Sequence, residues 1–298
     1  MGIVLDVKNV ARTFSENKGI LDISFQLKQR EILFLYGEHD TGKTLLLQIL
    51  IGAILPESGV VELFGSSDYI KEKNRIGYVP QKPYYIESMT IKETLSYFSL
   101  LLGTLDREFE KILDLNIDEK KPVNKLPLYV QRIVNLGVAL LGNPDLVLLD
   151  EPFDGLDSKE CEKLISVITY LNENNNTSFL ITGQNYEAVS QIATNIGILS
   201  NGRLVANFTH KNLLEDCERC IKLKTPQLTK AITVLQEDYA QYEVLSDDLL
   251  RIFCPLNHAS KINTKLVHAG IEVSEIWIAG MKPQEYISKL VRGAIDYD

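Results

Sequence analysis

The chain has 298 residues, of which 45% are hydrophobic and 24% are charged, and its formal net charge is −9. This composition is typical of a soluble globular protein with one large core and a smaller one. The negative charge argues against a nucleic-acid partner. The longest apolar run, residues 45–55, is far shorter than the roughly 20 residues that span a bilayer, and the N-terminus lacks the pattern of a signal peptide. We therefore expect any link to a membrane to run through a partner protein, and the four cysteines fit a reducing compartment.

Apolar or alternating stretches in the first forty residues predict strands over 4–8, 23–27 and 31–35. We expect them to form a small β-layer beside the motif that follows. Phe14 lies in a polar stretch between the first two strands. An aromatic ring there can stack on a base or pack beneath a loop, and the residues alone leave both interpretations open.

The pattern G-x-x-x-x-G-K-T occurs between an apolar strand and an apolar helix that ends near Leu55. This is the context of a phosphate-binding loop, because glycines let backbone N–H groups and the helix N-terminus face a phosphate. Lys43 should reach the β- and γ-phosphates of a nucleotide, and the Thr44 hydroxyl should bind Mg²⁺. The expected nucleotide contacts are Gly37, Glu38, His39, Asp40, Thr41, Gly42, Lys43, Thr44 and Leu45.

A second motif, residues 144–152, reads as a buried apolar strand that ends in Asp150 and Glu151. Open α/β sheets bind ligands at the carboxyl ends of such strands, so Asp150 should meet the phosphate-binding loop. There it can hold Mg²⁺ through water, which completes what Thr44 begins. Glu151 is placed to polarise the water that attacks a γ-phosphate. A solvated turn is the alternative for two adjacent acids, but it is uncommon after such a strand.

These motifs occur in the order found in the ATP-binding cassette of ABC transporters, with Gln81 in Gly-Tyr-Val-Pro-Gln and Gly155-Leu156-Asp157 among them. The chain resembles that family over roughly residues 3–210. The resemblance implies an α/β P-loop NTPase cassette with a mixed sheet core, an antiparallel β layer and a helical subdomain at about 85–140. It also implies ATP and Mg²⁺ as ligands: Phe14 stacks on adenine, Gln81 joins the γ-phosphate shell, and Thr44, Gln81 and Asp150 bind the metal.

In this family two cassettes sandwich two ATP molecules and drive a polytopic transmembrane subunit at the cytoplasmic face of the cell membrane. The resemblance places Asp157 in the loop that crosses the interface between the cassettes. Residues 88–102 have helical spacing after a cap at Ser88 or Thr90, with Glu93 close behind. They resemble the subdomain that receives the membrane subunit, and Tyr84, Tyr85 and Phe98 are candidates for that groove. Local core packing is the competing interpretation, above all for Phe98.

The chain departs from the family at the signature Leu-Ser-Gly-Gly-Gln. Counting back from Asn143 without a gap places it at Leu126–Val130, where only the leucine matches. The missing serine and glycines would have let a helix N-terminus approach a γ-phosphate closely. We therefore expect a poor ATP clamp at this loop, although Pro127 suits a helix start and a helix over 131–141 should persist.

Two further departures lie at the phosphate side. Gln184 stands at the position of the family's switch histidine, unless the register is off by one residue. Together with Glu151 it is our candidate catalytic residue, but its amide cannot relay a proton. Asp40 stands where cassettes usually have glycine. The favoured interpretation is that its side chain points to solvent, and the alternative is that its carboxylate repels a polyphosphate.

Residues 211–298 alternate between strands and helices in the order βαββαβ, followed by a last helix, which predicts a small α+β, ferredoxin-like domain. This part weakly resembles the C-terminal extension of exporter cassettes of the bacitracin and lantibiotic type. We expect it to act as a stabilising or dimerising cap. Reduced thiols are the favoured interpretation of its cysteines, and a zinc site is the alternative, with the ligands Cys217, Cys220, Cys254 and His258.

The resemblance supports an ATP-hydrolysing subunit of a membrane exporter for peptides, drugs or lipids. Because a homodimer would contain the weak clamp twice, we expect a second, non-identical cassette subunit as partner. The alternative is a nucleotide-binding regulatory subunit that hydrolyses ATP weakly or not at all, which Gln184 and the altered signature favour. A non-transport cassette is a third interpretation, less favoured because such proteins usually carry two cassettes in one chain.

Overall fold

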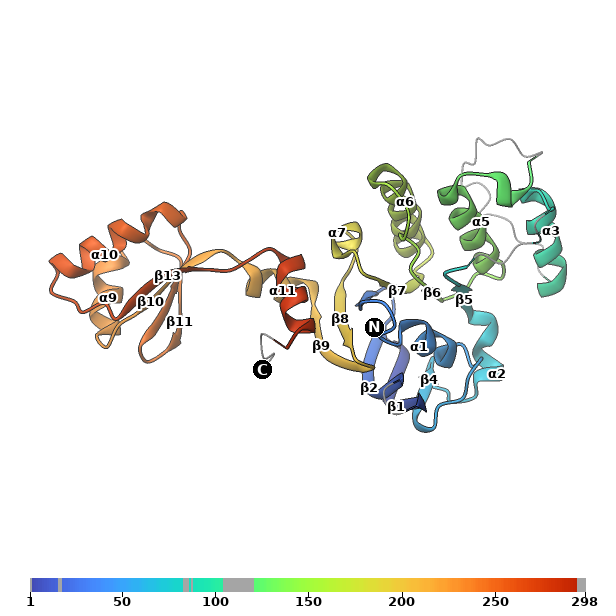
Figure 1. The fold of residues 1–298 in the computed structure, drawn as a ribbon, viewed down its shortest axis with the longest axis horizontal. Coiled ribbons are helices and arrows are strands. Elements are labelled where there is room, and N and C mark those ends of the chain that lie inside the picture. Colours follow the sequence, from blue (N-terminus) through green and yellow to red (C-terminus); the bar gives the residue numbers. More distant parts are fainter. Residues whose placement is uncertain (1, 16–17, 83–85, 87, 104–120, 294–298) are drawn as a thin grey trace. The chain divides into compact units, whose positions relative to one another are not determined.

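The computed structural model describes residues 2–15, 18–82, 86, 88–103 and 121–293, so Tyr84 and Tyr85 lie outside the described residues. The chain divides into two compact units: Met1–His210 with Ile287–Asp298, and Lys211–Tyr286 (Figure 1). The sequence-based division assigned everything after residue 210 to one accessory domain. The structure instead returns the chain to the first unit at Ile287, and the Ser200 hydroxyl donates to the Val291 carbonyl oxygen at 3.3 Å.

The first unit is built on a six-stranded sheet with the order β5-β6-β7-β3-β8-β9, parallel except for the pair β8 and β9. Strands β3 and β6 are buried at every position, as unbroken apolar runs predict for strands covered on both faces. Since β6, β7 and β3 are parallel neighbours, the residues that follow them lie together at one edge. The strands are β3 (Ile32–Tyr36), β5 (Ile76–Val79), β6 (Leu146–Leu149), β7 (Ser178–Gly183), β8 (Asn195–Ser200) and β9 (Arg203–Thr209).

A three-stranded antiparallel sheet, β2-β1-β4, forms a second layer with β1 (Ile3–Ser15), β2 (Lys18–Lys28) and β4 (Ser58–Leu63). Strands β1 and β2 are longer than expected because register shifts interrupt the alternation that would have shown their full length. Helix α1 (Lys43–Leu50) shares one buried apolar cluster with this sheet, including Leu46 and Ile23. The helix after the phosphate-binding loop is thus packed against this sheet.

Helices α3 (Ile91–Leu102) and α5 (Leu128–Leu140) correspond to the expected helical subdomain. Thr90 caps α3 through a capping box with Glu93, which decides between the two caps that the sequence allowed. Helix α5 begins at Leu128, three residues earlier than expected, directly after Pro127. Phe98 is half-buried and meets Tyr97 edge-on at 5.4 Å between ring centroids. The unit also contains α2 (Tyr69–Glu72), η1 (Lys73–Arg75), η2 (Val123–Lys125), α6 (Ser158–Asn174) and α7 (Tyr186–Val189).

The second unit has a four-stranded antiparallel sheet with the order β11-β12-β10-β13, and its elements follow the βαββαβ order. Its core joins alternate residues of β10 and β12 to the apolar faces of α9 and α10. The expected strand over 271–278 is wrong in its first half, because the Ile271 amide donates to the Leu266 carbonyl and closes the turn after α10. The elements are β10 (Cys220–Lys224), α9 (Leu228–Leu235), β11 (Tyr242–Ser246), β12 (Leu249–Ile252), η3 (Leu256–His258), α10 (Ala259–His268) and β13 (Glu275–Ala279).

Two helices contain the borders between the units, α8 (His210–Cys217) and α11 (Pro283–Val291). Across the described ranges, none of the helices combines the length and the apolar character that crossing a bilayer requires.

Candidate functional site

The loop between β3 and α1 has backbone conformations that few side chains adopt. Gly42 has φ 99° and Asp40 has φ 59°, both in the left-handed region, which aspartate tolerates better than most residues. A Cβ at Gly42 would lie 2.7 Å from Cγ2 of Ile20, and a Cβ at Gly37 would lie 2.5 Å from Oγ1 of Thr41. The loop therefore requires both glycines of the motif, and it is pressed against strand β2.

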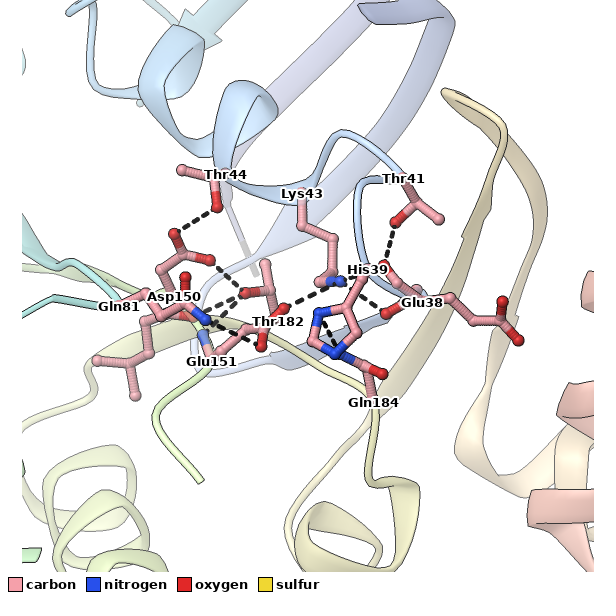
Figure 2. A network of polar contacts seen from close by, with 12 residues as sticks. Glu38, His39, Thr41, Lys43, Thr44, Gln81, Asp150, Glu151, Thr182 and Gln184 are labelled. Atoms are coloured by element: carbon pink, nitrogen blue, oxygen red, sulfur yellow. Dashed lines mark hydrogen bonds and ion pairs between the residues drawn. The ribbon is translucent and has the colours of Figure 1, made fainter. Parts of the chain in front are cut away.

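Lys43 is buried, and its ammonium lies inside this loop (Figure 2). Its Nζ donates to the carbonyl oxygens of Gly37 and Glu38, both at 2.6 Å, and forms an ion pair with Glu151 at 3.0 Å. A buried ammonium needs such partners. Internal acceptors therefore hold the charge at the place where a phosphate oxygen can replace them.

Asp150 follows β6 and accepts a hydrogen bond at each carboxylate oxygen. The Thr44 hydroxyl donates to Oδ2 at 2.8 Å, and the Thr182 hydroxyl donates to Oδ1 at 2.8 Å. Burial raises the pKa of Asp150, and the two hydroxyl donors oppose that effect. The expected neighbours Thr44 and Asp150 are thus in direct contact.

Glu151 is oriented by its backbone and by both carboxylate oxygens. Its φ of 48° is left-handed, and its amide donates to Oγ1 of Thr182 at 3.0 Å. Its Oε1 pairs with Lys43, and its Oε2 accepts from Nε2 of Gln81 at 3.4 Å. Lysine, glutamine and glutamate from three separate elements therefore meet at one point (Figure 2).

The residues expected to bind magnesium offer the oxygen ligands that this ion prefers. A threonine hydroxyl and a buried carboxylate are already within 2.8 Å of each other. A cation beside Asp150 would also offset the cost of burying that carboxylate, which its raised pKa reflects. The donor set of Thr44 and Asp150 fits Mg²⁺, with the Gln81 amide oxygen as a further ligand on the segment after β5.

Gln184 follows β7, and its side chain meets His39 of the phosphate-binding loop (Figure 2). Its Nε2 lies 3.1 Å from Nδ1 and 3.2 Å from Nε2 of the imidazole. Both side chains line a cavity of about 270 Å³ together with Glu151 and Thr182. The candidate catalytic residues therefore face one hollow beside Lys43.

Phe14 lies near the end of β1 and is 61% exposed. This exposure contradicts the alternative in which its ring packs beneath the loop. The residue before it, Thr13, pairs with Gly19, which is next to the Ile20 that touches Gly42. Phe14 is therefore one residue away from the part of the β1–β2 pair that lies against the phosphate-binding loop.

The N-terminus of α5 carries bulk where the family's signature has none. Pro127 is the cap residue and provides no side-chain hydrogen bond. Leu128 is exposed, and its Cδ2 lies 3.0 Å from the position of a Cβ at Gly155. Tyr129 lies beneath Lys163, whose Nζ is 4.6 Å from the ring centroid. The first turn of this helix therefore carries two bulky side chains beside its backbone N–H groups.

Sequence reasoning missed two polar residues at the site. Thr182 links Asp150 to the Glu151 backbone, but no motif marks a threonine inside an apolar strand. Arg132 on α5 is buried and donates to the Gln81 carbonyl oxygen. A charged residue on the buried face of an apolar helix is the signal that could have identified it. Asp157, expected in an interface loop, caps α6 through a capping box with Glu160.

The cysteines do not form a metal site. Across the described residues, no three or more histidine, cysteine, aspartate or glutamate side chains gather in a way that could hold an ion. This contradicts the zinc alternative for Cys217, Cys220, Cys254 and His258. Burial raises the pKa of the Cys217 thiol to about 12, so the thiol stays protonated at neutral pH.

Comparisons with known proteins define the class of protein. Residues 20–154 match the family described as ABC transporter. An uncharacterized ABC transporter ATP-binding protein of Methanocaldococcus jannaschii is 31% identical over 71% of this chain and 78% of its own length. The chain belongs to the ABC transporter family, as an ATP-binding subunit. Cassettes of this family pair with transmembrane subunits, and the homologues of this chain are ATPases coupled to transport.

Other relatives match nearly the whole chain. The bacitracin transport ATP-binding protein BcrA of Bacillus licheniformis is 26% identical over 98% of this chain and 99% of its own length. The linearmycin resistance ATP-binding protein LnrL of Bacillus subtilis is 26% identical over 89% of each chain. The solved structure of an ABC transporter cassette in its ADP conformation has a TM-score of 0.64 at 19% identity, and the match covers 72% of this chain and 96% of the other. That likeness shows the cassette fold.

Proposed function

We propose that this chain is the ATP-hydrolysing cassette of an exporter for peptide, drug or lipid cargo, bound to its membrane subunit at the cytoplasmic face of the cell membrane. The observation that carries the proposal is the pair of contacts beside the phosphate-binding loop: the buried ion pair of Lys43 with Glu151, and the hydrogen bond from the Thr44 hydroxyl to buried Asp150. Relatives named for bacitracin transport and linearmycin resistance match along most of the chain and support this cargo class.

In this proposal each side chain has one role. Lys43 exchanges its loop carbonyl partners for phosphate oxygens, which releases the Glu151 carboxylate to orient a water molecule. The water oxygen attacks the terminal phosphorus, the bond to the ADP oxygen breaks, and the proton of the water leaves through Glu151. Thr44, Gln81 and Asp150 would hold Mg²⁺, which when bound would neutralise charge on the phosphates. Phe14 stacks on the adenine ring.

The partner cassette is proposed to be a different protein. A signature loop acts by bringing backbone N–H groups close to the γ-phosphate of the opposite subunit. Leu128 and Tyr129 occupy that position here, and Pro127 supplies no cap. A partner with an intact signature would complete the site that contains Glu151, whereas two copies of this chain would combine two weak clamps.

A regulatory subunit that binds nucleotide without hydrolysing it is the second candidate. Gln184 and the altered α5 terminus favour it, because both weaken contacts to the terminal phosphate. The intact contacts of Glu151 with Lys43 and Gln81 favour hydrolysis instead.

Replacement of Glu151 by glutamine in the assembled transporter separates the two candidates. The variant should abolish transport while ATP binding remains, because only the acceptor for the proton of the water is lost. The matched control is Glu173→Gln on α6, an exposed carboxylate that should transport normally. Unchanged transport in Glu151→Gln would favour the regulatory candidate. An ATP-dependent homodimer of the wild-type chain with rapid turnover would contradict the pairing with a different cassette.

A further inference from the structure

The contact between His39 and Gln184 joins two loops whose residues are 145 positions apart in the sequence. Both side chains are at the surface of the cavity, and Figure 2 shows them pointing toward each other below Lys43. Gln184 occupies the position at which the family pattern has an imidazole. The structure places an imidazole against that same position, from the phosphate-binding loop.

The geometry of the contact leaves the ring able to bind something else. Nε2 of Gln184 is almost equidistant from the two ring nitrogens, at 3.1 and 3.2 Å. The in-plane bonding directions of the two nitrogens diverge, so an atom at equal distance from both lies off each direction. The amide therefore positions the ring, while a ring N–H can donate to a third group.

The charged groups around the ring indicate what that third group is. Lys43 brings a positive charge to Glu151, which lines the cavity with His39. Asp154 also lines the cavity, and Asp40 follows His39 in the loop. In a P-loop the lysine binds the β- and γ-phosphates, so the terminal phosphate enters the space between Lys43 and this cavity. A hydrogen-bond donor on the cavity wall then faces phosphate oxygens.

We infer that His39 is a further catalytic residue, which donates a hydrogen bond to the terminal phosphate of bound ATP, with Gln184 as its positioning partner. This inference rests on the proposed hydrolytic function. During hydrolysis the water oxygen bonds to the terminal phosphorus, the bond to the ADP oxygen breaks, and a proton is released. With one ring nitrogen facing the Gln184 amide group, the N–H of the other nitrogen stabilises the negative charge on the phosphoryl oxygens during that step and retains its proton.

The first experiment measures steady-state ATP hydrolysis by the assembled transporter. Replacement of His39 by alanine should lower kcat by about tenfold or more and also raise KM, as expected for a donor that contacts the terminal phosphate of bound ATP and contacts it more strongly in the transition state. His268→Asn, an exposed imidazole of α10, is the matched control and should keep the wild-type kcat and KM.

A second variant tests whether the imidazole can act from either side of the cavity. The double change His39→Asn with Gln184→His exchanges the two side chains in kind. It should recover most of the kcat lost in His39→Asn, because an imidazole again faces the cavity. A double variant no more active than His39→Asn would contradict the inference.

Binding provides a readout that does not depend on turnover. In the Glu151→Gln background, His39→Ala should weaken ATP binding by about tenfold, the effect of one charge-assisted hydrogen bond. ADP binding should not change, because ADP lacks the phosphate that His39 contacts. Equal effects on ATP and ADP, or no effect on ATP, would overturn the inference.

The results also separate this inference from the proposed function. An active wild type whose kcat and KM survive His39→Ala would overturn the role of His39 alone. A wild type without turnover in the assembled transporter would contradict the hydrolytic function, and the catalytic role of His39 with it.

Discussion

The two surfaces of the first unit that would face ATP differ sharply in how they are built. At the phosphate-binding loop, polar groups satisfy one another at 2.6–3.0 Å, from buried Lys43 to the loop carbonyls and Glu151, and from the Thr44 hydroxyl to buried Asp150. At the start of α5, Leu128 and Tyr129 place bulky side chains beside the first backbone N–H groups of the helix. On the proposed function, the chain would hold and cleave its own nucleotide well and clamp that of another subunit poorly.

This difference teaches that the two halves of a composite site can diverge independently. The core beneath the altered loop is intact, because Val130 is buried and α5 remains a helix of 13 residues. In the proposed dimer, loss of the signature would thus leave folding intact and weaken only a contact made between chains.

The largest expected effect comes from removing the lysine of the phosphate-binding loop. Lys43→Ala should weaken ATP binding by about 3 kcal/mol, on the order of a hundredfold in Kd, because charge-assisted hydrogen bonds to phosphate are lost. Isothermal titration calorimetry measures this, with the exposed Lys230→Ala as control. Circular dichroism checks the fold, since Glu151 would lose its buried partner. An unchanged Kd would erase the contrast between the two surfaces.

Restoring the signature residues at the start of α5 should reduce the functional difference between the two surfaces. Combining Pro127→Ser, Leu128→Gly and Tyr129→Gly in the Glu151→Gln background should strengthen ATP-dependent self-association by about tenfold, because backbone N–H groups become accessible. Val130 is left unchanged because it is buried. Light scattering after size-exclusion chromatography detects the dimer.

The two glycines should lower helix stability by roughly 1 kcal/mol each, so Pro127→Ser alone serves as a second variant with a favourable cap. Leu214→Gly on α8 controls for the loss of an exposed leucine from a helix. Absence of dimer in a folded triple variant would show that another feature prevents pairing.

A smaller gain in ATP affinity is expected from a change within the phosphate-binding loop itself. Asp40→Gly should tighten ATP binding by up to about tenfold, since a carboxylate about 6 Å from a phosphate charge costs roughly 3 kcal/mol before salt screening. The left-handed backbone at this position suits glycine at least as well. The affinities of the wild type and the variant should differ at low salt and converge at high salt, because salt screens the repulsion. An affinity identical to the wild type would show that the exposed carboxylate points to solvent.

The smallest expected effect concerns the stability of the nucleotide-free protein. Because burial raises the pKa of Asp150 above its ordinary value of 3.8, the folded state binds the proton more tightly than the unfolded state. The free energy of unfolding therefore falls as pH rises from that ordinary value through the raised one. The Asp150→Asn variant should not lose this stability as pH rises, so its melting temperature at pH 7 should be a few degrees above that of the wild type.

Differential scanning calorimetry across pH 4–8 measures this change. The exposed Asp247→Asn should melt like the wild type. A lower melting temperature for Asp150→Asn would mean that the contacts of the carboxylate with Thr44 and Thr182 outweigh its burial.

Sequence reasoning predicted the parts of the site that local spacing encodes. The loop from Gly37 to Thr44 and the acids after β6 lie where their motifs indicated, since a buried strand fixes where its last residue points. Thr182 and Arg132 could not be found in this way, because their partners come from distant segments and their sequence surroundings are apolar. The strand expected from Ile271 failed because local alternation cannot distinguish a strand from a turn that buries every second residue.

The chain enters the first unit a second time at Ile287, and this affects where the protein can be truncated. Ile287 and Leu290 are buried and belong to the first unit, although more than seventy residues of the other unit precede them. A truncation at residue 210 would strip an integral piece from the nucleotide-binding unit as well. Replacing residues 211–286 with a short linker is the cleaner excision, because it keeps Ile287 and Leu290 of α11 with the unit to which they belong.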